Sequence, residues 1–321
     1  MEVGIVGATG LVGRTLLSIL ESKGYDFHNY HLFASSDKIN PMSYFKQEIH
    51  ISEYSFDKAE KMDVLFACAG SEFAQQELPK LAQAGVVCID NSSFWRMHDE
   101  VPLIVPEING SLARTSNLIS NPNCSTIQLV LALNPLIDLG IQEVVVSTYQ
   151  SVSGAGNDGI KSWQAEVNSS EQESIFERKI HANLIPKIDV WMELDETREE
   201  WKVRNESKKI LSHDVQISCH AVRVPVEFSH SEAVRILFEK EVDIEDIKSR
   251  LSNTDGVVLT DSRDWSDCLD SAGKESVFVG RLRKDPSNSR AVWLWVVSDN
   301  LYKGAALNAI QIAEKLDGFT Q

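Results

Sequence analysis

The chain has 321 residues, of which 43% are hydrophobic and 24% are charged. This composition is typical of a globular protein with about two domains, and it excludes the disordered and fibrous classes. The formal net charge of -16 would repel a polyphosphate backbone, so we expect no nucleic-acid partner. An anionic substrate would then need locally placed cations.

The cysteines and the N-terminus indicate the compartment. The cysteines form an odd, scattered set without a C-x-x-C pair, which predicts neither a disulfide framework nor a metal site. The N-terminal "MEVGIVGATG" lacks a basic region, and no apolar run of about 18 residues follows it. We therefore expect a cytoplasmic protein of a reducing compartment, without a membrane segment. The cysteines are Cys68, Cys88, Cys124, Cys219 and Cys268.

The first part of the chain alternates short apolar strands with helices. This alternation predicts an α/β fold with a Rossmann-like, doubly wound parallel sheet. The dinucleotide-binding domain is expected to cover residues 1–125. Its strands are expected at 2–7, 31–35, 63–70 and 86–92, and its helices at 11–24 and 72–85.

The second part begins with an apolar helix expected at 125–140, after which several strands follow one another without intervening helices. This order predicts an α+β domain over residues 126–300 with a mostly antiparallel sheet. The charge-rich segment 161–211 is expected to be partly helical and to build part of the site or of a subunit interface. An amphipathic helix over 300–316 is expected to return to the first domain, which would then include residues 301–321. The expected strands are 142–152, 215–226, 233–239, 276–285 and 291–299.

Gly7, Gly10 and Gly13 stand at G-x-x-G-x-x-G spacing between an expected strand and an expected helix. Glycine permits a tight turn and a close ligand, and backbone N–H groups at a helix start can bind a pyrophosphate. The motif favours a dinucleotide over a merely tight turn, although other nucleotide-binding families carry similar glycines. At the end of the second strand, here "ASSDKIN" (34–40), an acidic residue favours NAD and a basic one favours NADP.

Cys124 lies in "SNPNCST", between small polar residues and an apolar run. A buried structural cysteine usually has apolar neighbours, and a zinc ligand usually has a second Cys or His nearby. A helix N-terminus favours the thiolate, which is the nucleophilic form. Because Pro122 ends the preceding extended segment, Cys124 is expected at the start of the following helix. The alternative is a small residue that fills a tight turn.

A nucleophile needs a general acid or base, for which histidine is the usual candidate. Among the eight histidines, His230 in "RVPVEFSHSEA" is expected in a turn after a strand that also carries Arg223. For each of the other seven, a surface or structural role is expected. Sequence spacing does not show that His230 meets Cys124.

These segments lie in an order that resembles the aspartate-semialdehyde dehydrogenases. The resemblance spans nearly the whole chain, and the combination is far more specific than any one motif. The segments are "GATGLVG", "DNSSFWR", "SNPNCST", "STYQSVSGAG", "EEWKVRNES", "RVPVEFSHSEA" and "LWVVSDNLYKGAALNAIQIAE".

The resemblance implies a role for each matching residue. Cys124 would be the nucleophile, His230 the acid or base, and Gln150 an orienting residue beside the thioester carbonyl. Arg223 would hold the substrate α-carboxylate, for which a planar guanidinium is suited, and Glu199 would hold the amino group.

The resemblance also implies residues for phosphate and for the cofactor. Arg96 and Lys202 would bind the phosphate, with Asn123 helping. Lys202 would share one face of a helix with Glu199, although the two could also be an ordinary solvated ion pair. The cofactor, NADP, would contact Gly7, Thr9, Gly10, Leu11, Val12, Gly13, Ser35, Ser36, Gly154 and Asn300.

The implied reaction is the reversible reductive dephosphorylation of β-aspartyl phosphate to aspartate semialdehyde, in the biosynthesis of aspartate-derived amino acids. Thiolate attack expels phosphate and leaves a thioester that can accept hydride from the nicotinamide. The resemblance further implies a homodimer joined through the second, catalytic domain.

Three positions depart from the pattern of the family. Asp37 stands where members that use NADP commonly carry Arg, and its carboxylate would repel a 2′-phosphate. We therefore expect a reduced preference for NADP over NAD. Ser229 replaces a glycine and Ser151 a common alanine; if Ser229 has a positive φ, we expect strain and slower turnover.

Two other functions fit parts of the pattern. N-acetyl-glutamyl-phosphate reductase shares the cysteine, thioester and hydride chemistry, but "NPNCST" and "RVPVEFSHSEA" match the aspartyl enzyme more closely. A longer acylated substrate would also not need Glu199 as an amine partner. A non-catalytic dinucleotide-binding paralogue would have no need for Cys124, Gln150, Arg223 and His230 together.

Overall fold

The computed structural model describes residues 1–25, 30–35, 42–44, 47–169, 173–261 and 263–319. Its residues form two units, one of residues 1–122 with 305–321 and the other of residues 123–304. None of the described helices is long and apolar enough to cross a membrane.

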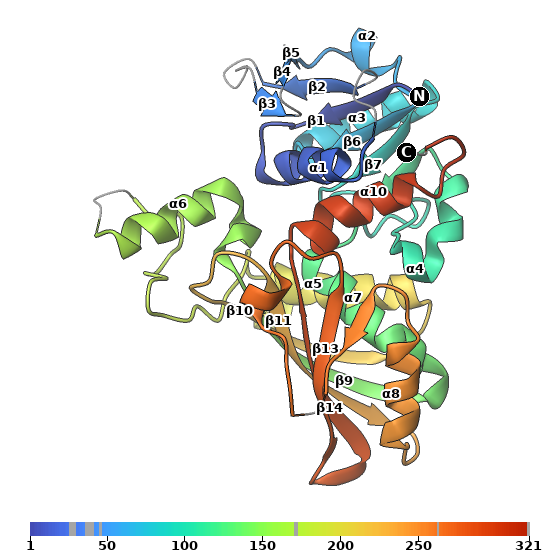
Figure 1. Cartoon of the computed structure of the whole chain (residues 1–321), viewed down its shortest axis with the longest axis vertical. Coiled ribbons are helices and arrows are strands. Elements are labelled where there is room, and N and C mark those ends of the chain that lie inside the picture. Colours follow the sequence, from blue (N-terminus) through green and yellow to red (C-terminus); the bar gives the residue numbers. More distant parts are fainter. Residues whose placement is uncertain (26–29, 36–41, 45–46, 170–172, 262, 320–321) are drawn as a thin grey trace. The chain divides into compact units, whose positions relative to one another are not determined.

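The first unit is built on a six-stranded sheet in the order β5-β2-β1-β6-β7-β8, and every described pairing in it is parallel. The Rossmann-like fold expected for this part of the chain is confirmed. The strands are β1 (Val3–Val6), β2 (Tyr30–Ala34), β5 (Ile51–Glu53), β6 (Val64–Ala67), β7 (Val87–Asp90) and β8 (Leu118–Ser120); β3 (Met42–Tyr44) and β4 (Gln47–Ile49) pair separately (Figure 1). The helices are α1 (Leu11–Ser22), α2 (Phe56–Ala59), α3 (Ser71–Gln83), α4 (Pro106–Asn109) and α10 (Leu307–Ala313), with a 3-10 turn at Gly110–Arg114.

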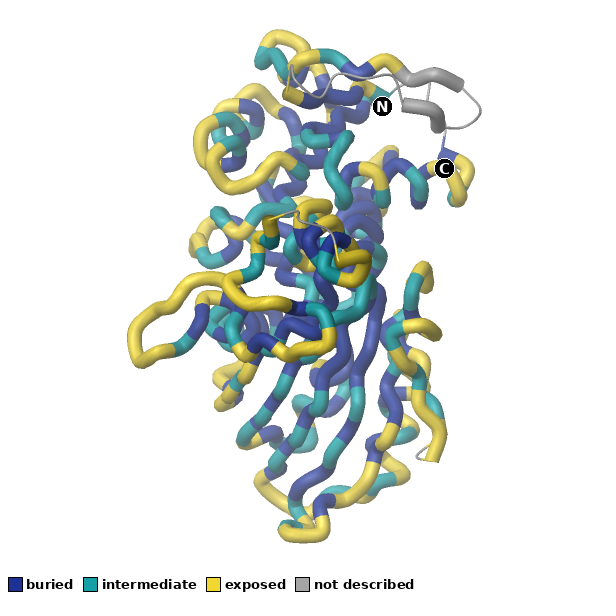
Figure 2. Tube along the Cα trace, turned by 90° about the vertical axis from the view of Figure 1, so that its left-hand side faces the viewer, coloured by how far each residue is buried: buried dark blue, intermediate teal, exposed yellow. Residues whose placement is uncertain are grey.

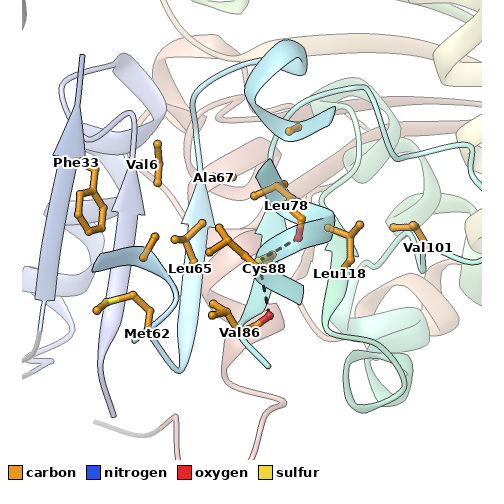
Figure 3. Packing of buried hydrophobic residues seen from close by; sticks show 13 residues of the cluster. Val6, Phe33, Met62, Leu65, Ala67, Leu78, Val86, Cys88, Val101 and Leu118 are labelled. Carbon is orange, nitrogen blue, oxygen red and sulfur yellow. Dashed lines mark hydrogen bonds between the residues drawn. The ribbon is translucent and has the colours of Figure 1, made fainter. Parts of the chain in front are cut away.

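The apolar strands of the first unit make its core because both faces of a parallel sheet are covered. β1 and β6 are buried at every residue. Leu65 and Cys88 pack with Phe33 and Leu78 in one cluster, and the Cys88 thiol faces the carbonyl oxygens of Leu78 and Val86 at 4.0 and 3.6 Å (Figure 3). Cys88 is therefore a packed structural cysteine.

The second unit is built on a mixed six-stranded sheet in the order β10-β9-β11-β14-β13-β12. The inner pairings are antiparallel and the two outer ones are parallel, so the expected α+β fold with a mostly antiparallel sheet is confirmed. The strands are β9 (Ile141–Gln150), β10 (Gln216–Arg223), β11 (His230–Phe238), β12 (Val257–Leu259), β13 (Val277–Asp285) and β14 (Asn288–Ser298). The helices are α5 (Cys124–Leu133), α6 (Gly156–Val167), α7 (Arg198–Leu211), α8 (Ile244–Ser252) and α9 (Cys268–Ser271), with 3-10 turns at Asn134–Leu139, Val152–Ala155 and Glu193–Asp195.

The strands of the second unit alternate between buried and half-buried residues (Figure 2). This period of two indicates that one face of the sheet is covered, and α5 and α7 pack on the strands. α5 is buried from Ser125 to Leu133, which explains why it lacks a polar stripe. The strand ends and the helix starts of this unit carry several buried polar side chains, among them Gln150, Glu199 and His230.

Two expected helices differ from the structure. The helix expected over 125–140 ends at Leu133 and continues as a 3-10 turn, because the ring of Pro135 removes a backbone donor. The helix expected over 300–316 contains a π-helical turn, Tyr302–Ala306, before α10 begins at Leu307. Gly304 lies in that turn, where it packs against Cys124.

Candidate active site

The turn after β1 carries the glycines of the expected dinucleotide site. Gly7 has φ +78°, and a Cβ there would lie 2.4 Å from the carbonyl oxygen of Cys68. A Cβ on Gly13 would lie 2.4 Å from the Gly7 carbonyl oxygen. β1 and β6 are neighbours at the point where the strand order reverses, and sheets of this type bind ligands at that point. Glycine is therefore required at position 7 because the chain after β6 lies close, and at position 13 because α1 packs closely on the turn itself.

The start of α1 fits the pyrophosphate of a dinucleotide. Its N-cap is Gly10, and no described side chain caps the first turn, so the backbone N–H groups there can bind an anion. Leu11 and Val12 are the first residues of this helix, and the Thr9 carbonyl accepts a 2.9 Å hydrogen bond from Arg14 Nε. Ser35 directly follows β2. Ser36 and Asp37 lie outside the described residues.

Arg96 lies in the loop that follows β7, in the first unit. Its side chain is buried, and Nη2 donates a 3.1 Å hydrogen bond to the carbonyl oxygen of Asn91. Burial raises the pKa of nearby Asp90, while hydrogen bonds from Ser92 and the charge of Arg96 oppose that rise. Arg96 is therefore a positioned, buried cation and not a freely solvated surface charge.

In the second unit, the strand register brings three expected site residues into one row. Arg223 ends β10 and pairs with Gln150, which ends β9. Gln150 pairs with His230, the first residue of β11, and His230 pairs in turn with Ser298 of β14. Paired residues of adjacent strands point to the same face of a sheet. The side chains of Arg223, Gln150 and His230 therefore form a row across the strand ends, and we call these three residues the polar row.

The position expected for His230 is therefore wrong in one respect. The sequence predicts a turn there, whereas His230 begins β11 and hydrogen-bonds in the ladder between β9 and β14. Strand pairing across distant parts of the chain outweighs the local preference of "EFSHSE" for a turn. Ser229, directly before it, has φ +71°, so the condition set out for strain is met.

Cys124 is the first residue of α5, next to the polar row. Asn123 caps the helix, because its Oδ1 accepts hydrogen bonds from the N–H groups of Ser125 and Thr126 at 3.0 and 3.3 Å. The Asn123 N–H donates to Glu206 of α7 at 2.7 Å. The backbone that carries the thiol is thus fixed on both sides, and the thiol lies at the positive end of α5.

Glu199 collects hydrogen bonds from three directions. Its Oε1 accepts from Asn123 Nδ2 at 2.8 Å and from Gln150 Nε2 at 3.0 Å, and its Oε2 accepts from Lys202 Nζ at 3.1 Å. Burial opposes ionisation of Glu199, but the charges of Lys202 and Arg223 and the two amide hydrogen bonds outweigh it and lower its pKa to about 2. Glu199 is buried and the side chain of Lys202 is 13% exposed, so this is not an ordinary solvated ion pair.

Arg223 is held beside the thiol. It is 7% exposed, and its Nη1 donates a 2.8 Å hydrogen bond to the Ser151 carbonyl oxygen. Burial lowers the pKa of Arg223, while the charges of Glu199 and Cys124 oppose that change. An arginine keeps its charge under such conditions, so a cation lies close enough to Cys124 to stabilise a thiolate.

His230 is fully buried, and its hydrogen bonds indicate one tautomer. The backbone N–H of Ser151 donates to Nδ1 at 3.1 Å, so Nδ1 is the acceptor and the proton of the neutral ring lies on Nε2. Nε2 has no hydrogen-bond partner among the described residues. Burial, reinforced by the charge of Arg223, lowers the pKa of His230 to about 3. His230 is thus a neutral ring with an available Nε2 donor.

Gly154 and Asn300 surround this histidine. A Cβ on Gly154 would lie 2.7 Å from Arg223 Nη1 and 3.1 Å from His230 Nε2, so the missing side chain leaves both groups accessible. Asn300 Oδ1 accepts from the Ser229 N–H at 2.8 Å and from Ser151 Oγ at 3.2 Å. Both were expected at the cofactor; here Asn300 also ties the strained Ser229 to Ser151.

Several residues around the site were not singled out as site residues from the sequence. Glu206 binds the backbone before Cys124, and its spacing of seven from Glu199 along α7 is the signal that could have shown it. Gly304, whose Cβ would lie 2.9 Å from Cys124 Cβ, is a glycine inside an expected helix. Ser151 was noted only as a departure, yet it contacts His230, Ser153 and Asn300.

The second unit thus gathers a thiol at a helix start, a cation, a neutral histidine and a carboxylate that remains ionised. Such a set can carry out nucleophilic acyl transfer and can bind an amino acid through charges of both signs. Within the described ranges no group of three His, Cys, Asp or Glu residues could hold a metal ion. The expected residues in this unit are Asn123, Cys124, Gln150, Gly154, Glu199, Lys202, Arg223, His230 and Asn300, and those in the first unit are Gly7, Thr9, Gly10, Leu11, Val12, Gly13, Ser35 and Arg96.

A glycine turn suited to a dinucleotide in one unit, and side chains suited to thiol acyl transfer in the other, are typical of a dehydrogenase that works through a thioester. Family models agree: residues 2–116 match the semialdehyde dehydrogenase NAD binding domain, and residues 133–303 match the semialdehyde dehydrogenase dimerisation domain. The chain belongs to the aspartate-semialdehyde dehydrogenase family.

Relatives of that name match almost end to end. The enzyme of Aquifex aeolicus is 41% identical over 98% of this chain and 97% of its own length, and that of Bacillus subtilis is 40% identical over the same shares. A crystal structure of aspartate semialdehyde dehydrogenase II from Vibrio cholerae, complexed with ASA, has a TM-score of 0.92 and 37% identity, covering 98% of this chain and 97% of that one. Both the sequence family and the fold therefore support one class of enzyme.

Proposed function

We propose that this protein catalyses the reversible reductive dephosphorylation of β-aspartyl phosphate to aspartate semialdehyde, a step toward the aspartate-derived amino acids. The observation that carries the proposal is the placement of Cys124 at the start of α5, beside the buried Gln150, Arg223 and His230 of the polar row. The names of the relatives in Aquifex aeolicus and Bacillus subtilis support it.

The Cys124 thiolate attacks the acyl carbon of the substrate. The new C–S bond forms as the C–O bond to phosphate breaks, and the phosphate leaves with the electron pair. The helix start and Arg223 stabilise the thiolate before attack. Gln150 donates to Glu199, so its amide is fixed beside the reacting carbonyl.

The two charged residues near the thiol recognise the amino-acid part of the substrate. Arg223 presents a planar guanidinium to the α-carboxylate, and the ionised Glu199 presents an oxygen to the α-ammonium group. Lys202 of α7 binds the phosphate, and Asn123 keeps the carboxylate of Glu199 in place. Binding of both ends positions the acyl carbon at the thiol.

His230 acts through its Nε2 proton. When hydride adds to the thioester carbon, the carbonyl oxygen becomes an alkoxide, and an Nε2–H donor stabilises that charge. The alkoxide then re-forms the C=O bond and expels the Cys124 thiolate, which frees the semialdehyde. The Ser151 N–H donates to Nδ1, so in the resting enzyme the proton of His230 lies on Nε2. Nε2 therefore acts as a hydrogen-bond donor and not as a base.

The nicotinamide dinucleotide supplies or accepts the hydride when it is bound. Gly7, Gly10 and Gly13 receive its pyrophosphate at the start of α1, and Gly154 leaves space beside Arg223 and His230. We propose NADP as the cofactor. We expect its preference over NAD to be smaller than is usual in the family, because Asp37 comes shortly after β2 in the sequence and its carboxylate would repel a 2′-phosphate. Asp37 itself lies outside the described residues.

The direct test is cofactor reduction with aspartate semialdehyde and inorganic phosphate, with NADP and NAD supplied separately. We expect activity that depends on phosphate and that disappears in Cys124→Ala. Activity without phosphate, or activity that survives in Cys124→Ala, would contradict the thioester route. NAD turnover orders of magnitude below that with NADP would contradict the reduced preference.

We also propose that the chain functions as a homodimer through the second unit, as the dimerisation description of the matched model suggests. The uncovered face of the sheet carries half-buried aromatic rings: Tyr149 and Trp295 lie 5.7 Å apart, and Arg283 lies 5.8 Å from the Trp293 ring centroid. Light scattering should give the mass of a dimer, and Trp295→Asp should lower it. A wild-type monomer would exclude this assembly.

A further inference from the structure

Lys202 is bound by two carboxylates of unequal character. Its Nζ donates to Glu199 Oε2 at 3.1 Å and to Asp189 Oδ2 at 2.8 Å. Glu199 is buried and accepts hydrogen bonds from two side-chain amides. The side chain of Asp189, in contrast, is 26% exposed. Asp189 Oδ2 can therefore exchange Nζ for water at a lower cost than Glu199 Oε2 can.

The position of Asp189 is fixed by its own backbone. Its φ is +73°, a left-handed conformation that Asp tolerates, and its Oδ1 accepts the N–H of Val190 at 2.8 Å. The Val190 carbonyl oxygen in turn accepts from the N–H of Arg198, the first residue of α7. The backbone of Asp189 is therefore held beside the helix that carries Lys202, and its Oδ2 faces Nζ.

The same segment is attached to the residue proposed for the α-carboxylate. Ile185 and Arg223 exchange two backbone hydrogen bonds, N–H to oxygen in each direction, at 3.0 and 2.9 Å. Four residues later the chain places Asp189 against Lys202. The segment thus bridges two proposed substrate-binding cations and adds a negative charge to one of them.

We propose that Asp189 determines the affinity of the site for phosphate by competing for the Lys202 ammonium. This inference rests on the proposed function, in which Lys202 binds the phosphate of the substrate. A phosphate oxygen replaces Asp189 Oδ2 on Nζ, and the displaced carboxylate is hydrated; no covalent bond changes.

The charges set the direction of the effect. In the resting enzyme one ammonium faces two carboxylates, and the Asp189 carboxylate adds a negative charge that repels a phosphate dianion approaching Lys202 Nζ. Removal of the Asp189 charge takes away this repulsion, while the contact between Glu199 and Nζ remains. Asp189 therefore weakens phosphate binding, which hastens phosphate release in the reductive direction and raises the KM for phosphate in the reverse direction.

The test uses Asp189→Asn, because Asn keeps the shape and tolerates positive φ while the charge is lost. The matched control is Asp214→Asn, which removes the same charge from an exposed pair with Lys208 on the same helix. In the phosphate-consuming direction, Asp189→Asn should lower the KM for phosphate by about three- to tenfold. The KM for the semialdehyde should stay unchanged, and Asp214→Asn should change neither.

Two further variants separate the possible outcomes. An unchanged or raised KM for phosphate in Asp189→Asn would overturn the inference; if that variant does not fold, Asp189→Gly, which suits positive φ, repeats the measurement. Lys202→Met should raise the KM for phosphate. If it does not, the role of Lys202 in the proposed function fails; if it does while Asp189→Asn has no effect, only the role of Asp189 fails.

Discussion

The turn after β1 and the polar row of the second unit both prepare a place for a ligand, but they do so in opposite ways. In the turn, Gly7 and Gly13 act through side chains that are missing, since a Cβ on either would lie 2.4 Å from a backbone oxygen. In the polar row and its surroundings, Glu199, Arg223 and His230 act through side chains that are present and at most 7% exposed.

The difference implies opposite sensitivities to mutation. Gly7 and Gly13 tolerate no added methyl group, because the obstacle is backbone: the Cys68 carbonyl after β6 for Gly7, and the turn itself for Gly13. The polar row tolerates no removed group, because each buried polar atom that loses its partner carries a desolvation cost. Substitutions that test each region can therefore be chosen so that the other region is unaffected.

The largest effect on catalysis is expected from Glu199→Gln. The variant removes the charge that balances Lys202 and places amide hydrogens near Nζ, so it should cost about 3 kcal/mol of unfolding free energy. It should also lower kcat/KM by about 10²- to 10³-fold, since the ammonium group of the substrate loses its partner. Urea denaturation and steady-state kinetics measure the two.

The control for this variant is Glu196→Gln, which removes one charge from a partly exposed pair with Arg204 just before α7. It should cost less than about 1 kcal/mol. Equal effects of the two substitutions would show that burial of Glu199 gives it no special weight, and the contrast between the two regions would fail.

In the first unit, Gly7→Ala is expected to cost about 3 kcal/mol or more, from backbone strain together with overlap with the carbonyl group of Cys68. Gly24→Ala is its control: φ is +77° there too, but nothing lies within 4 Å of the added Cβ. That variant should lose only about 1 kcal/mol. Thermal or urea unfolding of both variants isolates the steric part, and equal losses would refute the close packing of this turn.

The sequence predicts most of this architecture because the signals are local. Apolar strands alternating with helices predict the first unit, and the run of strands without helices predicts the second. The expected pairing of Glu199 with Lys202 needs only their spacing of three on one helix. A left-handed backbone at Ser229 could also be considered from the sequence, because a glycine is usual at this position in the family.

What the sequence does not show are the contacts between distant segments. The row Arg223, Gln150 and His230 depends on strand register, which no spacing within a strand reveals. The same pairing extends β11 to His230, where local composition predicts a turn. The early end of α5 is a different case: Pro135 is a local signal, and the apolar pattern that continues past it hides the change to a 3-10 turn.

The pH dependence of stability sharpens the account of the polar row. The pKa of His230 is about 3 in the folded protein and about 6.5 when unfolded, so the unfolded state binds an extra proton between these values. Stability therefore falls as the pH drops from about 6.5 toward 3, by about 2 kcal/mol from this residue between pH 7.5 and 5.0. Glu199 adds to the loss only below about pH 4.5.

His230→Gln is the variant that isolates this contribution. Urea unfolding at pH 7.5 and 5.0 should show that the wild type loses about 2 kcal/mol more than the variant. An equal loss in both would mean that His230 is protonated in the folded state. The Ser151 N–H could then not donate to Nδ1 at pH 5.0, because a protonated ring has no acceptor nitrogen.

The smallest effect is expected at Ser229, where two terms nearly cancel. Its φ of +71° costs about 1 kcal/mol relative to glycine, and its Oγ donates a 3.1 Å hydrogen bond to the Cys268 carbonyl oxygen that returns a similar amount. Ser229→Gly loses both and should change the free energy of unfolding by less than about 1 kcal/mol.

Ser229→Ala keeps the strained backbone and loses the hydrogen bond, so it should be less stable than the wild type by about 1 kcal/mol. Turnover further distinguishes the backbone strain from the hydrogen bond of the hydroxyl group. Because the Ser229 N–H binds Asn300 and the next residue is His230, relief of strain in Ser229→Gly should raise kcat, whereas Ser229→Ala should not. A faster Ser229→Ala enzyme would show that the hydroxyl group, and not the backbone, limits the placement of His230.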